Sequence, residues 1–237
     1  MSSGASPEQI AGWLAEALET GNPLAPLPAG AEPAGVAEGV HVAALVLASL
    51  GLVPCGLRFA PGPDGAMLAG PVLEGRLLPD GAAVALATAR HAAVAPGVMG
   101  VLAEDLPAEA DGGLPAFSAL HPILDVSAWR LRDRPGSPGL AAADLSGHGF
   151  IVAGRGKCGM VAGPLPVGMA PAGAKRRPQT LDAAAALLAA ARAARLAGGL
   201  PRGAVLAAVL GPSVAPAEGQ EIVAGLGALG RVRAAFR

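Results

Sequence analysis

The chain has 237 residues, enough for one generous domain or two small ones with a real hydrophobic core. Its net charge is −1, from 17 basic and 18 acidic residues that are interspersed, and no basic stripe indicates nucleic-acid binding. Hydrophobic residues make up 52% of the chain and aromatic residues only 3%, so Ala, Val and Leu must build the core through many small contacts.

A first helix is predicted immediately after Ser6. Ser6 can cap the helix, Pro7 suits the first helical position, and Gln9 stands at capping-box spacing from Ser6. One apolar stripe follows, and Gly21 ends the helix. The stripe consists of Ile10, Trp13, Leu14 and Leu18. A Pro/Gly-rich connector then runs to about Pro33.

A second helix is predicted from Val36 to Leu50, ending at Gly51. It is apolar nearly all round, so it should be well buried. The uncharged run 39–57 contains Gly51 and Pro54, which favours a buried helix followed by a strand over a membrane span. The N-terminus shows no secretory signal and the two cysteines form no CxxC, so we expect a cytoplasmic protein.

From Val53 to about Ala162, short runs of Val, Leu and Ile alternate with turn signals, which is typical of a mainly β body. A third helix is predicted over residues 181–196, with Thr180 as its cap and Asp182 in its first turn. Residues 204–210 and 221–236 are predicted as strands. We find no linker that divides the chain, and expect a single domain, 1–237, with a helical part (1–52) and a β-rich body (53–237).

Residues 154–159 spell GxGxxG after a predicted strand. A dinucleotide site needs this motif to open a helix, with an acidic residue about 20 positions later. Pro164 and Pro166 forbid a long helix here, so a glycine-rich turn is the better interpretation. The four histidines share no metal-binding spacing, and Cys55 has no base near it in sequence.

A series of weak polar motifs remains, and their order is more informative than any one of them. In chain order they are GLRF (56–59), GPVLEGRL (70–77), EDLP (104–107), HPILDV (121–126), ADLS (143–146) before FIV (150–152), VLGPS (209–213) and LGALGRV (226–232).

That order resembles the 2-keto-4-pentenoate hydratase and 4-oxalocrotonate decarboxylase group of the fumarylacetoacetate hydrolase superfamily, over almost the whole chain. The resemblance implies an α+β fold: a mainly antiparallel or mixed β roll, with N-terminal helices and one later helix packed on it. It also implies a Mg²⁺ or Mn²⁺ site inside the roll. Such a hard cation prefers carboxylate and water oxygens, and as a Lewis acid it stabilises an enolate.

In that group, two glutamates of a Glu-Pro-Glu segment bind the metal, shortly before a D-L-P corner. Aligned through residues 105–107, those two positions are Ala95 and Gly97, and the third ligand position falls at Asp125. The family lysine position holds Arg58, which stays protonated and is a poor general base. One aspartate does not make a divalent site, so we expect no metal cofactor; Mg²⁺ or Mn²⁺ would follow only from a different alignment.

Two interpretations follow. In the first, the protein works without metal on a small 2-keto or enol carboxylate, which it acts on or only binds. Arg58 and Arg76 would clamp the anion, while Asp144 and Ser213 would line the pocket, as the resemblance implies. Proton transfer would fall to Glu74, His121, Asp125 or His148. Ordinary ion pairs explain the same charges equally well.

In the second interpretation, the chain is a catalytically inactive scaffold or a partner subunit of an active relative, in a homo-oligomer or a hetero-complex. A metal-free enzyme should place Arg58 and at least one of Glu74, His121 or His148 in one cavity. A scaffold should lack such a cluster and carry a large apolar interface. A small-molecule binding module would keep the arginines and lose the acid/base residues. No membrane or nucleic-acid partner is expected.

Overall fold

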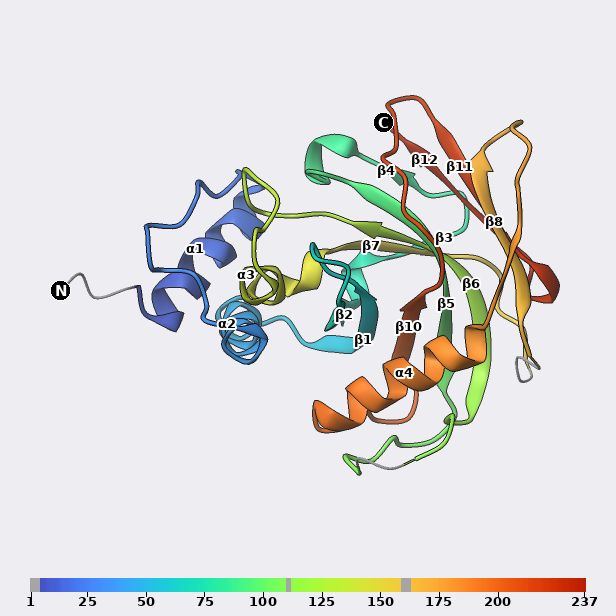
Figure 1. Ribbon diagram of the computed structural model, residues 1–237, viewed down its shortest axis with the longest axis horizontal. Coiled ribbons are helices and arrows are strands. Elements are labelled where there is room, and N and C mark those ends of the chain that lie inside the picture. Colours follow the sequence, from blue (N-terminus) through green and yellow to red (C-terminus); the bar gives the residue numbers. More distant parts are fainter. Residues whose placement is uncertain (1–4, 110–111, 159–162) are drawn as a thin grey trace.

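The computed structural model describes residues 5–109, 112–158 and 163–237. It has the predicted α+β architecture, with curled mixed β sheets and few helices (Figure 1). Helices α1 (Pro7–Thr20), α2 (Val36–Ser49) and α3 (Pro138–Ala143) gather at one end, whereas α4 (Ala183–Leu196) lies against the strands. Within the described residues, no helix is both long and apolar enough to span a membrane.

The larger sheet has the order β2-β1-β10-β5-β6-β7-β3 and curls into a roll (Figure 1). Its neighbouring strands are antiparallel except for the pairs β1/β10 and β3/β7. The strands are β1 (Pro54–Pro61), β2 (Met67–Leu73), β3 (Leu77–Pro79), β5 (Ala93–Leu102), β6 (Phe117–Ser127), β7 (His148–Ala153) and β10 (Val205–Val209). A short 3-10 turn, η1 (Glu74–Arg76), joins β2 to β3.

The smaller sheet has the order β4-β12-β11-β8-β9. Its strands are β4 (Ala83–Val84), β8 (Leu165–Pro171), β9 (Gln179–Leu181), β11 (Glu221–Leu226) and β12 (Arg231–Phe236). Three further 3-10 turns are η2 (Leu86–Thr88), η3 (Leu145–Gly147) and η4 (Gly227–Leu229). The main hydrophobic core combines side chains of both sheets and α4, and consists mostly of Ala, Val and Leu, as the composition predicts.

The interior of the roll holds a separate apolar cluster. Its buried members come from five strands: Val72, Met99, Ile123, Ile151, Val205 and Ala207. Because side chains alternate between the two faces of a strand, this cluster and the main core lie on opposite faces of the larger sheet. The polar residues described below share the inner face with this cluster.

Helix α1 begins and ends as predicted. The Ser6 hydroxyl accepts a hydrogen bond from the Gln9 backbone N–H and the Gln9 side chain accepts one from the Ser6 N–H, while Gly21 closes the helix in the left-handed conformation. Helix α3 was missed, although it starts with the same signal. Ser137 caps it and Pro138 occupies its first position.

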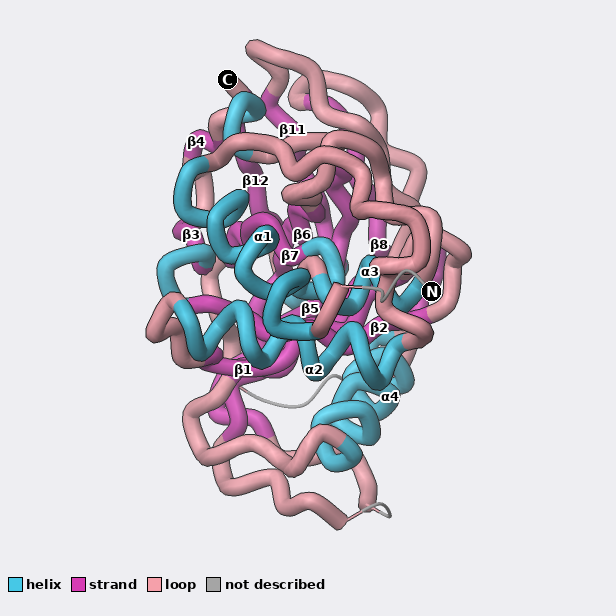
Figure 2. The backbone as a smooth tube through the Cα atoms, turned by 90° about the vertical axis from the view of Figure 1, so that its left-hand side faces the viewer, coloured by secondary structure: helices cyan, strands magenta, loops and turns pink. Residues whose placement is uncertain are grey.

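Helix α2 lies where the sequence predicts it, but its expected burial on all sides is wrong. Val36 and Val40 are 42% and 49% exposed. The helix packs through its other face, where Gly39 meets the backbone of α3 so closely that a Cβ atom would lie 2.1 Å from the Gly139 carbonyl oxygen. Helix α2 therefore carries apolar residues both on its buried face and along an exposed stripe. Figure 2 views the molecule from the end where this helix lies.

The predicted cap of the later helix is also wrong. Thr180 lies in β9, which pairs with β8, and the helix starts two residues later than predicted. Asp182 is the true cap, since its Oδ1 accepts a hydrogen bond from the Ala185 N–H at 2.9 Å. Because Thr180 pairs with β8, its backbone is extended and part of a strand. Asp182, the next polar residue, caps the helix instead.

Replacing Asp182 by alanine should therefore lower the free energy of unfolding by about 1 kcal/mol, the usual effect of removing a capping side chain. Thr180→Ala is the matched control and should change it by less than about 0.5 kcal/mol, because Thr180 is an exposed residue of a strand. Urea unfolding of both variants measures the difference. Equal losses in the two variants would restore Thr180 as the cap.

The GxGxxG stretch lies between strands. β7 ends at Ala153, directly before Gly154, and β8 begins at Leu165. Gly159 and residues 160–162 lie outside the described residues. Gly154 is packed closely, because a Cβ atom there would lie 2.5 Å from the Arg231 carbonyl oxygen. Packing against β12 thus accounts for this glycine.

Candidate functional site

A cavity of about 380 Å³, here called the central cavity, opens on the inner face of the roll. Strands β1, β5 and β6 supply its innermost residues, Arg58, Ala95 and Asp125. The segment after β10 closes it with Gly211, Pro212 and Ser213. These residues lie far apart in sequence and meet because the sheet curls (Figure 1).

Arg58 and Asp125 form a bidentate ion pair at the bottom of this cavity. Arg58 Nε donates to Asp125 Oδ1 at 2.5 Å, and Nη2 donates to Oδ2 at 2.6 Å. Nη1 donates to the Ser146 carbonyl oxygen at 2.8 Å. Both side chains are only 3% exposed. The fork geometry matches guanidinium to carboxylate, so each charge is balanced by the other.

The residues that meet here do not fit a divalent cation. Ala95 stands directly opposite Asp125 in the β5/β6 register, and its methyl group offers no ligand. Gly97 leaves no room for one, since a Cβ there would lie 2.6 Å from the Ala208 carbonyl oxygen. Both Asp125 oxygens already accept from Arg58. Across the described residues, no group of three His, Cys, Asp or Glu side chains could hold a metal.

A smaller cavity of about 160 Å³ continues the central cavity outward. The two share four lining residues, Pro61, Ala93, Ser127 and Ser213. The smaller one adds His91, Trp129 and Arg134, so the mouth carries a cationic arginine and an imidazole. His91 Nε2 lies 2.7 Å from the Arg132 carbonyl oxygen and therefore donates to it. Sequence analysis did not assign these residues to the site, although His91 lies two residues before the strand that carries Ala95.

Three of the proposed acid/base and clamp residues lie elsewhere. His121 is on β6, where its Nδ1 lies 2.9 Å from the Gly154 carbonyl oxygen. Glu74 is exposed on η1, and Arg76, at the end of the same turn, lines cavities formed with α1. None of the three lines the central cavity. The structure therefore brings together Arg58, Asp125 and Ser213 and separates them from Glu74, Arg76 and His121.

Asp144 is fully buried in a second ion pair, with Arg130. Arg130 Nε donates to Asp144 Oδ1, and the Arg130 backbone N–H donates to Oδ2 at 2.9 Å. Burial raises the pKa of Asp144, and its interactions with Arg130 act in the opposite direction. Asp144 does not line the central cavity. No sequence motif predicts that Asp144 pairs with Arg130, because only the tertiary fold brings the two residues together.

His148 is buried between the two ion pairs, at the start of β7. Its Nε2 accepts a hydrogen bond from the Leu73 N–H at 3.4 Å, and its Nδ1 has no partner among the described residues. Burial, and then the positive charges of Arg58, Arg130 and Arg76, lower its pKa well below the ordinary value. His148 is thus a neutral imidazole, and it does not line the central cavity.

Comparison by sequence finds no protein-family model that matches the chain and no curated protein that matches it. Comparison of folds gives clear likenesses. A 4-oxalocrotonate decarboxylase from Pseudomonas putida G7, complexed with magnesium and adipate, aligns with a TM-score of 0.78 at 18% identity, over 98% of this chain and 99% of that one. The chain has the fold of the fumarylacetoacetate hydrolase superfamily.

Two other solved structures support this fold. A probable 2-hydroxyhepta-2,4-diene-1,7-dioate isomerase from Mycobacterium abscessus aligns with a TM-score of 0.59 at 14% identity, over 76% of this chain and 75% of that one. A fumarylpyruvate hydrolase from Pseudomonas aeruginosa, in complex with Mn²⁺ and pyruvate, gives 0.52 at 11% identity, over 72% and 78%. Decarboxylases, isomerases and hydrolases thus share this fold, and the fold alone does not choose a reaction.

Proposed function

We propose that this protein binds a small 2-keto or enol carboxylate in the central cavity without a metal, and without the Mg²⁺-dependent chemistry that the resemblance to the hydratase and decarboxylase group implies. The Arg58–Asp125 ion pair is the observation that carries the proposal. It fills the bottom of the cavity with an internal salt bridge at the position aligned with a metal ligand. Two of the three structures named above were solved with a carboxylate, one with magnesium and adipate and one with Mn²⁺ and pyruvate, which supports a carboxylate as the ligand class.

The polar groups around the cavity suit a carboxylate ligand. Arg58 uses one N–H on each of Nε, Nη1 and Nη2, so two N–H groups of its guanidinium remain for a further acceptor. The Ser213 hydroxyl lines the same cavity, and Arg134 adds positive charge at the mouth. Proton transfer has less support, because Asp125 is neutralised by Arg58, and Glu74, His121 and His148 lie outside the cavity. We therefore favour binding over catalysis.

Calorimetric titration with pyruvate, in EDTA and then in excess Mg²⁺, tests this proposal. The affinity should be the same in both, and a 2-hydroxydienoate should not be turned over in either. Ser213→Trp should abolish binding by filling the cavity, whereas Ser118→Trp, on the outer face of β6, serves as the matched control. Turnover that depends on Mg²⁺ would overturn the proposal.

The second candidate is an inactive scaffold or partner subunit, and the exposed apolar stripe of α2 favours it. Val36 and Val40 lie one helical turn apart, and Val53, just beyond the helix, is 83% exposed. Such a surface suits a second copy of the chain or a related subunit. Absence of pyruvate binding together with a sedimentation mass above that of one chain would favour this role.

A further inference from the structure

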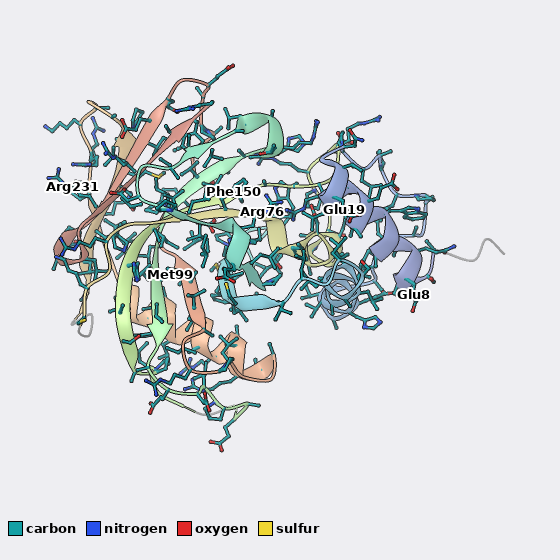
Figure 3. All side chains as sticks on the ribbon, turned by 180° about the vertical axis from the view of Figure 1, so that it is seen from behind. Glu8, Glu19, Arg76, Met99, Phe150 and Arg231 are labelled. Carbon is teal, nitrogen blue, oxygen red and sulfur yellow. The ribbon has the colours of Figure 1, made fainter. Side chains whose placement is uncertain are left out.

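A second cavity, of about 440 Å³, lies between the C-terminal end of α1 and the β roll. We call it the helix-side cavity. It shares no lining residue with the central cavity. Three arginines line it, Arg76, Arg90 and Arg130, against one carboxylate, that of Glu19. Figure 3 labels Arg76 and Glu19 together with Phe150, which also lines the cavity. Three separate segments, the end of η1, the connection before β5 and the segment after β6, thus contribute positive charge to one cavity.

Arg130 is a fixed member of this group. Its guanidinium is held by Asp144 and by the His148 carbonyl oxygen, to which Nη1 donates at 2.6 Å. The Asp144 carboxylate balances its charge. Arg130 therefore shapes the cavity and keeps its position without a ligand.

Arg76 is different, because no described carboxylate forms an ion pair with it. Its guanidinium carbon lies 4.8 Å from the centre of the Phe150 ring, and in the described chain it forms no ion pair and no hydrogen bond. Burial and the charge of Arg130 lower the pKa of Arg76. The Phe150 ring stabilises one face of the cation, and the N–H groups on its edge are left for a ligand.

Arg90 adds a second uncompensated charge at the same cavity. It is exposed, and among the described residues it also forms no ion pair within 4.0 Å. Glu19 is exposed on α1 and lies farther than 4.0 Å from every described arginine. Counting Arg130 as neutralised by Asp144, two positive charges face one negative charge around the cavity. A partly buried excess of positive charge is relieved by an anion.

We propose that the helix-side cavity binds a small oxyanion, a carboxylate or a phosphate, through Arg76 and Arg90. Guanidinium groups pair with either oxyanion in a bidentate manner. A volume of about 440 Å³ also leaves room for an organic part, which would contact the Trp129 indole on the cavity wall. Trp129 also lines the smaller cavity beside the central one, but the helix-side cavity shares no residue with the central cavity and does not depend on the function proposed for it.

Calorimetric titration at low ionic strength, with inorganic phosphate and with succinate as probes, tests the site. At least one of the two should bind, and Arg76→Gln should weaken that binding at least about tenfold, since one charge-assisted contact is lost. Arg233→Gln is the matched control: it removes the same charge from an exposed arginine of β12 and should leave the affinity unchanged. Thermal unfolding of each variant checks that it is folded.

The preferred probe identifies the source of the anion. Binding of phosphate alone assigns a phosphorylated ligand, and binding of succinate alone assigns a carboxylate. Ser213→Trp should leave the titration unchanged, because Ser213 lines the central cavity and the smaller cavity beside it but not the helix-side cavity. Three results would overturn the proposal: no binding of either probe, equal weakening by Arg76→Gln and Arg233→Gln, or loss of binding in Ser213→Trp.

Discussion

Replacing Arg58 by methionine is expected to lower the free energy of unfolding by about 3–5 kcal/mol. The Asp125 carboxylate, 3% exposed, would be left in the interior of the roll without its counter-charge. Asp125→Leu should cost a similar amount, because it leaves the Arg58 guanidinium unpaired. Urea unfolding at neutral pH measures both. A loss below about 1 kcal/mol in both variants would mean that water or another group solvates the remaining charge.

The double variant Arg58→Met/Asp125→Leu should recover most of this loss, because two apolar side chains of similar size replace a pair whose desolvation cost nearly cancels its attraction. The double-mutant cycle then gives the coupling between the two residues. The exposed pair of Arg233 and Glu221, 3.6 Å apart, is the control, and Arg233→Met should change stability by less than about 1 kcal/mol.

Local signals explain how much of the fold could be predicted. Ser6, Pro7 and Gln9 define the start of α1 through contacts within four residues, and the structure reproduces them. Thr180 and Asp182 are both good capping residues, and the choice between them depends on whether β9 pairs with β8, which is a tertiary contact. Sequence position alone could not decide that choice.

The candidate site also has one part that the sequence predicts and one part that depends on tertiary contacts. The resemblance assigns Ala95 and Asp125 to ligand positions of one metal site, and the β5/β6 register places them opposite each other. The partner of Asp125 could not be predicted, because Arg58 reaches it across a curled sheet from 67 residues away. Arg76 illustrates the opposite error: η1 carries it toward α1, away from the Arg58 side chain with which it was expected to act.

Lowering the pH from 7.5 to 5.5 is expected to destabilise the protein through His148 by about 1.4 kcal/mol. The buried imidazole has a pKa well below that of the unfolded chain, about 6.5. Below pH 6.5, His148 is therefore protonated in the unfolded state but remains neutral in the folded state. Stability from this group is complete above about pH 7.5 and declines as the pH falls, until the folded state is protonated as well.

The physical cause is first the burial of His148, which disfavours a charged imidazole, and then the positive charges around it. Arg58, Arg130 and Arg76 all oppose a further positive charge, and protonation of Nε2 would cost the hydrogen bond that it accepts from the Leu73 N–H. In His148→Gln, the side-chain oxygen can accept from the Leu73 N–H but cannot be protonated in this range. Its free energy of unfolding should lack the 1.4 kcal/mol decline between pH 7.5 and 5.5, as measured by urea titration at both values. Asp144, whose pKa burial raises, is present in both proteins and cancels in the comparison. An equal decline in wild type and variant would assign the pH dependence to other groups.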